Sequence, residues 1–306
     1  MIAVFGSGFG IYGHLPALVE SGHPVCIPSR YRPVVEERTE LAAYRSEVRF
    51  IDDEETLLST SELAVLARRP ADNAALARRV IAKRFPLRVV IEKPLAPTPS
   101  DALSLERELR TARMRYATPY LLQYCDWARN CRLEVAAGRA VEIELNWHFS
   151  SKQPQDSWKS ISQEGGGALS YYFIHVIALG EFLLGDYQVV ECLSVNGEPG
   201  SGLKMVAVNG SVRFSATFCT GPGASMFALN LNGIPAFTAD TPFGANPRRG
   251  FRDPRIESLK RFYTDEVFTL AAQQPDESRN SRTLTVWADL AKRMNSEYVS
   301  LRNVAR

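Results

Sequence analysis

The sequence predicts an α/β protein in two parts: an N-terminal Rossmann domain with a doubly wound parallel sheet, and a C-terminal α+β domain with an open, mainly antiparallel sheet. In the first part, short apolar runs alternate with segments of helical period, which indicates βαβ units. In the second part, several segments alternate apolar and polar residues with period two. A chain of 306 residues is long enough for both. We expect the first domain at residues 1–118 and the second at 119–306.

The strands and helices expected in the first domain alternate along the chain. The apolar runs that we predict as strands are residues 2–5, 24–27, 48–51, 62–67, 87–92 and 115–120. The segments of helical period between them are residues 11–21, 34–46, 71–85 and 100–112. Right-handed connections of this kind place the strands in one parallel sheet.

The second domain opens with a strand over residues 141–149, where Val, Ile, Leu, Trp and Phe alternate with Glu, Glu, Asn and His. Further strand-like runs, broken by Gly, Pro and Asn, lie at 189–195, 204–210, 211–218 and 225–231. Two helical stretches, about 254–274 and 280–298, end the chain, and the Pro-, Gly- and Arg-rich residues 244–254 are expected to form a loop.

Composition narrows the class of protein. With a net charge of +2, the protein lacks the excess of basic residues that is typical of nucleic-acid-binding proteins. The five cysteines form no CxxC and no metal-ligand spacing with histidine, which favours free thiols in the cytoplasm and no metal. No signal peptide is expected, because residues 1–5 already resemble a strand. The most apolar segment, 171–184, is interrupted by His175 and Glu181 and falls short of the roughly 20 residues that span a membrane, so we predict a buried helix.

The turn after the first strand reads VFGSGFGIYGH. Gly6 and Gly8 have the spacing of the dinucleotide fingerprint, and a helix from Gly10 follows, with Phe9 between them. Ile11 occupies the third glycine position, and Gly10 beside it partly compensates. A second frame that begins at Gly8 leaves too short a helix. The alternative is a merely tight turn between strand and helix.

The end of the second strand bears on the form of the cofactor. NAD enzymes place an acid there for the ribose 2′-hydroxyl. From the end of this strand onward, the first acid in the sequence is Glu36. Ser29 can donate a hydrogen bond, while Arg30 and Arg32 can meet a 2′-phosphate. This favours NADP, with NAD as the other possibility. The alternative is that these arginines belong to a solvated loop.

The strand 87–92 ends in Glu92, Lys93 and Pro94. An ammonium group at the carboxyl edge of a parallel sheet lies in the crevice where such sheets bind ligands, and Pro94 keeps the preceding lysine out of the helical region. A lysine at a strand end is usually only a surface residue. Together with the glycine turn and the sequence EGGGALSYYFIH at 164–175, Lys93 becomes the main catalytic candidate of the first domain.

With these motifs the sequence resembles the Gfo/Idh/MocA oxidoreductases. The matching pieces are GSGFGIYGHLPAL at 6–18, EKPLA at 92–96 and EGGGAL…H…LLG at 164–185. The resemblance covers nearly the whole chain. It implies hydride transfer between a nicotinamide cofactor and a carbinol or ketone carbon of a sugar or cyclic polyol, with Lys93 and His175 holding the substrate oxygen and moving its proton.

One departure concerns the residue four positions before the histidine, where the family usually has an aspartate and this sequence has Tyr171. Ala178 likewise replaces a second acid of many members. On a helix, Tyr171 lies one turn from His175, and Tyr172 borders the same face. Tyr171 could donate a proton or bind substrate, could be an aromatic platform for a sugar ring, or could mark a site that has lost its chemistry. A histidine satisfied within a core helix is the simplest alternative.

Secondary candidates complete the predicted site. The resemblance places Asn73 where a histidine often follows a proline, at the cofactor pocket, with an ordinary early-helix residue as the alternative. Candidates for contact with the cofactor are Arg68, Arg69, Pro70 and Glu92, and candidates for contact with the substrate are Trp158, Lys159 and Gly166. We expect His14 to pack or cap its helix, and His148 to be exposed or at a subunit contact.

The sequence therefore predicts an NADP-dependent oxidoreductase acting on a small, sugar-like substrate, as a homodimer or homotetramer without nucleic-acid, membrane or metal partners. Two alternatives remain open. One is a non-catalytic nucleotide-binding or regulatory relative. The other is a glycosidase or epimerase that oxidises its substrate transiently and retains NAD(P).

Overall fold

The computed structural model describes residues 1–150, 157–195, 202–269 and 277–304. The chain forms two compact units, and each is described by itself. Unit 1 comprises Met1–Ala96, Asp101–Leu121 and Pro247–Glu277, and unit 2 comprises Pro97–Ser100, Leu122–Asn246 and Ser278–Arg306. This division differs from one at residue 118, because residues 247–277 join the first unit.

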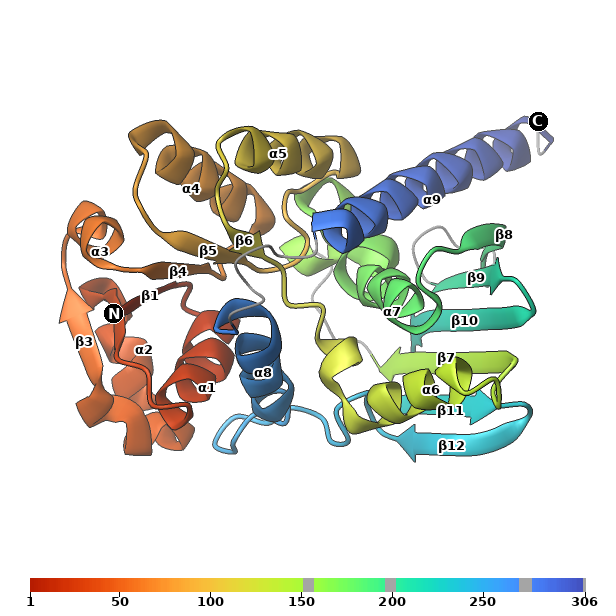
Figure 1. Cartoon of the computed structure of the whole chain (residues 1–306), viewed down its shortest axis with the longest axis horizontal. Coiled ribbons are helices and arrows are strands. Elements are labelled where there is room, and N and C mark those ends of the chain that lie inside the picture. The colour runs from red at the N-terminus through yellow and green to blue at the C-terminus, as the bar shows by residue number, and fades with distance from the viewer. Residues whose placement is uncertain (151–156, 196–201, 270–276, 305–306) are drawn as a thin grey trace. The chain divides into compact units, whose positions relative to one another are not determined.

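Unit 1 is built on a six-stranded sheet in the order β3-β2-β1-β4-β5-β6, and every pairing in it is parallel. The strands are β1 Ile2–Phe5, β2 Val25–Pro28, β3 Val48–Ile51, β4 Leu63–Leu66, β5 Arg88–Ile91 and β6 Tyr116–Ala117. The strands β1, β2 and β4 are wholly buried, as expected for a sheet covered on both faces. The predicted doubly wound sheet is confirmed, and the strand order reverses between β1 and β4 (Figure 1).

Within residues 1–121, the helices differ from the prediction in two places. The unit contains a π-helical turn Gly10–His14 that continues into α1 Leu15–Glu20, then α2 Arg32–Glu37, a 3-10 segment Thr39–Glu47, α3 Glu54–Thr60, α4 Pro70–Lys83 and α5 Pro99–Thr111. The expected helix 34–46 is interrupted because Arg38 has an extended backbone. The helix α3 was not predicted. It begins where the Asp53 carboxylate accepts a hydrogen bond of 2.7 Å from the Thr56 amide, a standard N-cap.

Residues 247–277 contribute α8 Ile256–Phe262 and a π-helical turn Tyr263–Val267 to unit 1. One helix was expected over residues 254–274. In the residues that the structure describes, the α-helix begins at Ile256 and ends at Phe262. α8 packs beside α1 (Figure 1). Arg252 donates to Glu20 at 2.6 Å, and this pairing lowers the pKa of Glu20 to about 2. The return of the late segment therefore rests on named contacts with the first helix.

Unit 2 is built on a six-stranded sheet in the order β12-β11-β7-β10-β9-β8. The strands are β7 Glu142–Ser150, β8 Gln188–Ser194, β9 Gly202–Asn209, β10 Val212–Gly221, β11 Met226–Leu231 and β12 Ile234–Ala239. β7 and β10 pair in parallel, and the other pairs are antiparallel. The predicted mainly antiparallel sheet is confirmed, with β12 as a strand that the sequence analysis missed.

The helices of unit 2 are α6 Asp126–Ala136, α7 Ile174–Leu184 and α9 Glu277–Val304. α6 was not predicted, and α9 corresponds to the helix expected at 280–298. α7 packs on β9 and β10. By length and composition, the stretch Ser162–Leu184 is apolar enough to cross a membrane. However, 72% of its most apolar 18-residue segment is buried inside the protein, as in a core helix.

One acid is buried within the apolar helix α7. Glu181 is 5% exposed and forms an ion pair of 2.8 Å with Arg282 of α9. Burial raises the pKa of Glu181 to about 7 in spite of the opposing effect of Arg282. The folded protein therefore binds this proton more tightly than the unfolded chain does.

We expect this raised pKa to make stability fall with pH. Between about pH 4.5 and 7 the folded state holds more protons than the unfolded state, so the free energy of unfolding decreases as pH rises. Glu181→Gln removes this dependence. Relative to wild type, the variant should gain up to about 3 kcal/mol between pH 5 and pH 8, measured by denaturant unfolding. A constant difference between the two proteins at these pH values would contradict the expectation.

Candidate functional site

The glycine turn after β1 is closely packed at Gly6 and Gly10 and open at Gly8. Gly6 has φ +140°, and a Cβ there would lie 2.1 Å from the Ala67 carbonyl oxygen, so only glycine fits. A Cβ on Gly10 would lie 3.3 Å from the side chains of Val4 and Ala67, which explains the close packing of the helix on the sheet. A Cβ on Gly8 would meet nothing within 4 Å. The space beside Gly8 is therefore open, and it fits the approach of a pyrophosphate.

The arginines after β2 are both engaged. Arg30 forms an ion pair with Glu54, the first residue of α3. The guanidinium of Arg32 lies 4.0 Å from the centroid of the Phe50 ring and 3.9 Å from Glu36. A phosphate at this edge would therefore meet arginines that already have partners.

Glu54 collects three arginines and was missed by the sequence analysis. Its Oε1 accepts from both Arg30 and Arg68, and its Oε2 accepts from Arg79 at 3.0 Å. Burial alone would raise the pKa of Glu54, but the hydrogen bonds from Arg30 and Arg68 outweigh it and lower the pKa to about 2. An acid was expected at the end of the second strand, whereas Glu54 follows the third.

The turn between β4 and α4 is fixed by Asn73. This buried side chain accepts a hydrogen bond of 2.8 Å from the Arg68 amide and donates one of 3.2 Å to the Arg68 carbonyl. Pro70 begins α4, where a missing N–H costs nothing. Asn73 therefore sets the backbone at the position where Arg68 turns toward Glu54.

The end of β5 is tied to the glycine turn by a buried histidine. His14 is fully buried, and its Nε2 lies 2.9 Å from Glu92 Oε1 while its Nδ1 lies 2.6 Å from the Tyr263 hydroxyl. Since a carboxylate only accepts, Nε2 carries the proton, and in the neutral imidazole Nδ1 accepts from Tyr263. His14 therefore holds the residue before Lys93, a role beyond the packing or capping that the sequence suggested.

The second group of candidates lies in unit 2, around a π-helical turn at Ala168–Phe173 that leads into α7. The expected single α-helix through Tyr171 and His175 is wrong at this point, because the wider turn changes the alignment of its side chains. His175 is the second residue of α7 and is 8% exposed. The two units hold different candidates: Lys93 belongs to unit 1, and Tyr171 and His175 belong to unit 2.

Aromatic rings surround Tyr171. Its centroid lies 5.5 Å from Trp158 and 4.8 Å from Tyr172, both edge-on, and the Lys159 ammonium lies 5.6 Å from it. Tyr172 stacks on Phe218 at 4.9 Å, and burial raises the pKa of its phenol. The candidate residues of unit 2 therefore form a cluster of aromatic rings with the Lys159 ammonium beside it.

The triple glycine has a structural reason at Gly166. A Cβ there would lie 2.2 Å from the Trp158 carbonyl oxygen and 2.5 Å from the carbonyl carbon of Lys159. Glycine thus lets this loop approach the backbone of residues 158–159, which places Trp158 and Lys159 beside the turn that carries Tyr171. His148, by contrast, is half-buried on β7 and hydrogen-bonds to the Ala224 carbonyl at 2.8 Å.

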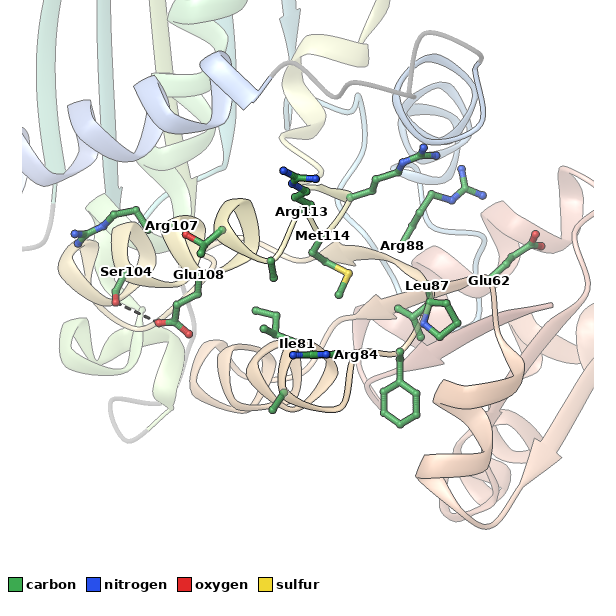
Figure 2. Close-up of a pocket in the computed structure, with 16 residues that line it drawn as sticks. Glu62, Ile81, Arg84, Leu87, Arg88, Ser104, Arg107, Glu108, Arg113 and Met114 are labelled. Carbon is green, nitrogen blue, oxygen red and sulfur yellow. Dashed lines mark hydrogen bonds between the residues drawn. The ribbon is translucent and has the colours of Figure 1, made fainter.

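A separate cavity of about 1340 Å³ lies at the amino-terminal edge of the parallel sheet and is lined by residues at the ends of α4 and α5 (Figure 2). Arg84, Arg88 and Arg113 line it, but its carboxylates are already paired: Glu62 with the N-terminal amine at 3.2 Å, and Glu108 with Arg78 at 2.9 Å. It is at the edge opposite the glycine turn. Within the described residues, no three His, Cys, Asp or Glu side chains form a group that could hold a metal.

No protein-family model and no curated protein matches the sequence. Solved structures do match. A myo-inositol dehydrogenase from Corynebacterium glutamicum is 11% identical, with 95% of this chain and 94% of that chain covered and a TM-score of 0.70. The WlbA dehydrogenase from Bordetella pertussis, in complex with NADH and UDP-GlcNAcA, is 15% identical (97% and 96% covered, TM-score 0.69). GenD2 from gentamicin A biosynthesis, in complex with NAD, is 20% identical (96% and 93% covered, TM-score 0.68).

This chain shares with the matched dehydrogenases a fold that has a Rossmann sheet and a second, mainly antiparallel sheet. More particularly, the fold is that of the myo-inositol dehydrogenases and related Gfo/Idh/MocA-type dehydrogenases, so the resemblance seen in the motifs is confirmed at the level of the fold.

Proposed function

We propose that the protein is a nicotinamide-dinucleotide-dependent oxidoreductase that acts on a carbinol or ketone carbon of a sugar or polyol. The main observation is the open space beside Gly8 at the carboxyl edge, where the strand order reverses between β1 and β4. Because fold alone does not define function, the site residues have to support the activity. The complex of WlbA with NADH and UDP-GlcNAcA gives a precedent on the same fold.

Each candidate residue of unit 1 has a proposed role in binding the dinucleotide. Gly6, Gly8, Phe9 and Gly10 form the turn that receives the pyrophosphate through backbone amides. Around it, the proposed contacts with ribose, with nicotinamide or with the phosphate of NADP are Ser29, Arg30, Arg32, Arg68, Pro70, Asn73, Glu92 and Lys93. When bound, the nicotinamide accepts or gives the hydride.

Lys93 is the proposed proton-moving group. An ammonium at the end of β5 can hold the substrate oxygen and give or take its proton as the carbon changes oxidation state. His14 hydrogen-bonds to Tyr263 and to Glu92, and so holds in place Glu92, the residue that precedes this lysine. In unit 2, His175 and Tyr171 are proposed to hold a substrate oxygen and move its proton, and Trp158, Gly166 and Tyr172 to bind the substrate.

The ammonium of Lys159 supports a role for Tyr171 in place of the family aspartate. The Lys159 ammonium lies 5.6 Å from the centroid of the Tyr171 ring, so a second hydrogen-bond donor stands beside this phenol. The same ring can serve as a platform for a sugar, since Trp158 stands edge-on to it. Both roles keep the site suited to a polar ring substrate.

We also propose a cytoplasmic homo-oligomer, dimer or tetramer, that forms through the sheet of unit 2. The exposed apolar side chains on its strands support this assembly: Val190, Leu193, Met226 and Ile234 are 50%, 43%, 47% and 70% exposed. Sedimentation of the purified protein would measure the subunit number.

The test begins with fluorescence titration of the purified protein with NADH and NADPH. We expect saturable binding of at least one, followed by a change in nicotinamide absorbance with a panel of polyols and ketosugars. Binding without turnover on any member of the panel would favour the non-catalytic relative. Cofactor retained through purification would favour the glycosidase or epimerase. Absence of binding by both nucleotides would overturn the proposal.

A further inference from the structure

Glu54 links two strands on either side of β1. Arg30 follows β2, Arg68 follows β4, and β1 lies between these strands in the sheet. The same oxygen of Glu54 accepts hydrogen bonds from both arginines. The guanidinium of Arg68 also lies 5.1 Å from the centroid of the Phe5 ring, the last residue of β1. This bridge therefore crosses the carboxyl end of β1, beside the turn that begins at Gly6.

The charges in the bridge are only partly exposed. The side chains of Arg68 and Glu54 are 18% and 19% exposed, and that of Arg30 is 51% exposed. Arg79 occupies the second oxygen of Glu54. Three guanidinium groups thus share one carboxylate, whose low pKa keeps it ionised at neutral pH.

We propose that Glu54 makes the protein prefer NAD(H) over NADP(H), an inference that rests on the proposed function. A 2′-phosphate carries negative charge and can only accept from arginine, so at this edge it would have to compete with Glu54 for Arg30 and Arg68 and would be repelled by the carboxylate. A ribose 2′-hydroxyl can instead donate a hydrogen bond to a carboxylate. NADP was favoured from the sequence because Arg30 and Arg32 follow the second strand. The acid that pairs with Arg30 is Glu54, which lies 24 positions further along the chain.

The competing explanation is that the bridge only anchors α3 to α4. Under that explanation, removal of the charge lowers stability and leaves the relative affinity for the two nucleotides unchanged. The preference between NADH and NADPH therefore separates the two, because it compares two ligands on the same folded protein.

The experiment compares wild type and Glu54→Gln by fluorescence titration with NADH and with NADPH, and by thermal unfolding without nucleotide. We expect wild type to bind NADH more tightly. In Glu54→Gln the affinity for NADPH relative to NADH should rise by about 10- to 100-fold, since the repelling charge is gone and both arginines are released. Adding Arg30→Gln to Glu54→Gln should abolish most of this gain.

Glu55→Gln is the matched control. Glu55 is the next residue of α3 and pairs with Lys83 instead of the bridge, so the ratio of affinities should stay at the wild-type value. Glu54→Asp keeps the charge and should also stay near wild type, which tests the charge should the glutamine variant fold poorly. A ratio in Glu54→Gln within twofold of wild type, or a wild type that prefers NADPH, would overturn this inference alone. Binding of neither nucleotide to wild type would overturn the proposed function with it.

Discussion

Replacement of Lys93 by alanine should lower turnover by about 10²- to 10⁴-fold while nucleotide binding survives. The proposed ammonium acts on the substrate oxygen as the hydride moves, so its loss affects the chemical step. The glycine turn that receives the pyrophosphate is a different segment, at Gly6–Gly10. The measurement is kcat with the substrate found in the panel, together with the dissociation constant for the preferred nucleotide.

Lys83→Ala is a suitable control for the loss of a lysine, because Lys83 lies at the end of α4 and pairs with Glu55. It should retain wild-type kcat. If Lys93→Ala also retains full turnover, the proposed mechanism is wrong even where the protein binds nucleotide and oxidises substrate. A fall in nucleotide affinity equal to the fall in kcat would show instead that Lys93 serves binding.

The same added methyl group should reduce stability at Gly6 and nucleotide affinity at Gly8. In Gly6→Ala, the new Cβ meets the Ala67 carbonyl at 2.1 Å and the residue must adopt φ +140°. We expect the free energy of unfolding to fall by about 3–5 kcal/mol. In Gly8→Ala, the Cβ meets no protein atom within 4 Å, so stability should change by less than about 1 kcal/mol.

Binding provides the second half of this comparison. The Cβ of Gly8→Ala projects into the space proposed for the pyrophosphate, so nucleotide affinity should fall at least tenfold although the protein remains folded. Denaturant unfolding and nucleotide titration on both variants measure the two effects. Unchanged affinity in Gly8→Ala would place the dinucleotide elsewhere.

The parallel sheet could be predicted because its strands are short apolar runs separated by helical segments, a local pattern. The second sheet could be predicted from alternation along residues 141–149. The helix α3 was missed because it is short and depends on its cap at Asp53 rather than on periodicity. The return of α8 to unit 1 could not be predicted, because it depends on contacts between residues more than 200 positions apart, such as Arg252 with Glu20.

The candidate site shows the same limit. The glycine turn and Glu92–Lys93 could be singled out from the sequence because each is continuous and follows a strand, and their roles stay predictions. Glu54 was missed although a signal existed: it follows the third strand, which neighbours the second in a Rossmann sheet, so its side chain could reach Arg30. The partner of His14 is Tyr263, 249 positions away, and no local pattern connects them.

The assignment of residues 247–277 to unit 1 has a consequence for biosynthesis. When the ribosome has made residues 1–121, the six parallel strands exist, but Tyr263 and α8 have not yet been synthesised. At about 5–20 residues per second, the wait is on the order of ten seconds. During that time α1 lacks its contact with α8, and the imidazole of His14 lacks its hydrogen bond to Tyr263. We therefore expect unit 1 to complete its folding only after residues 247–277 have been synthesised.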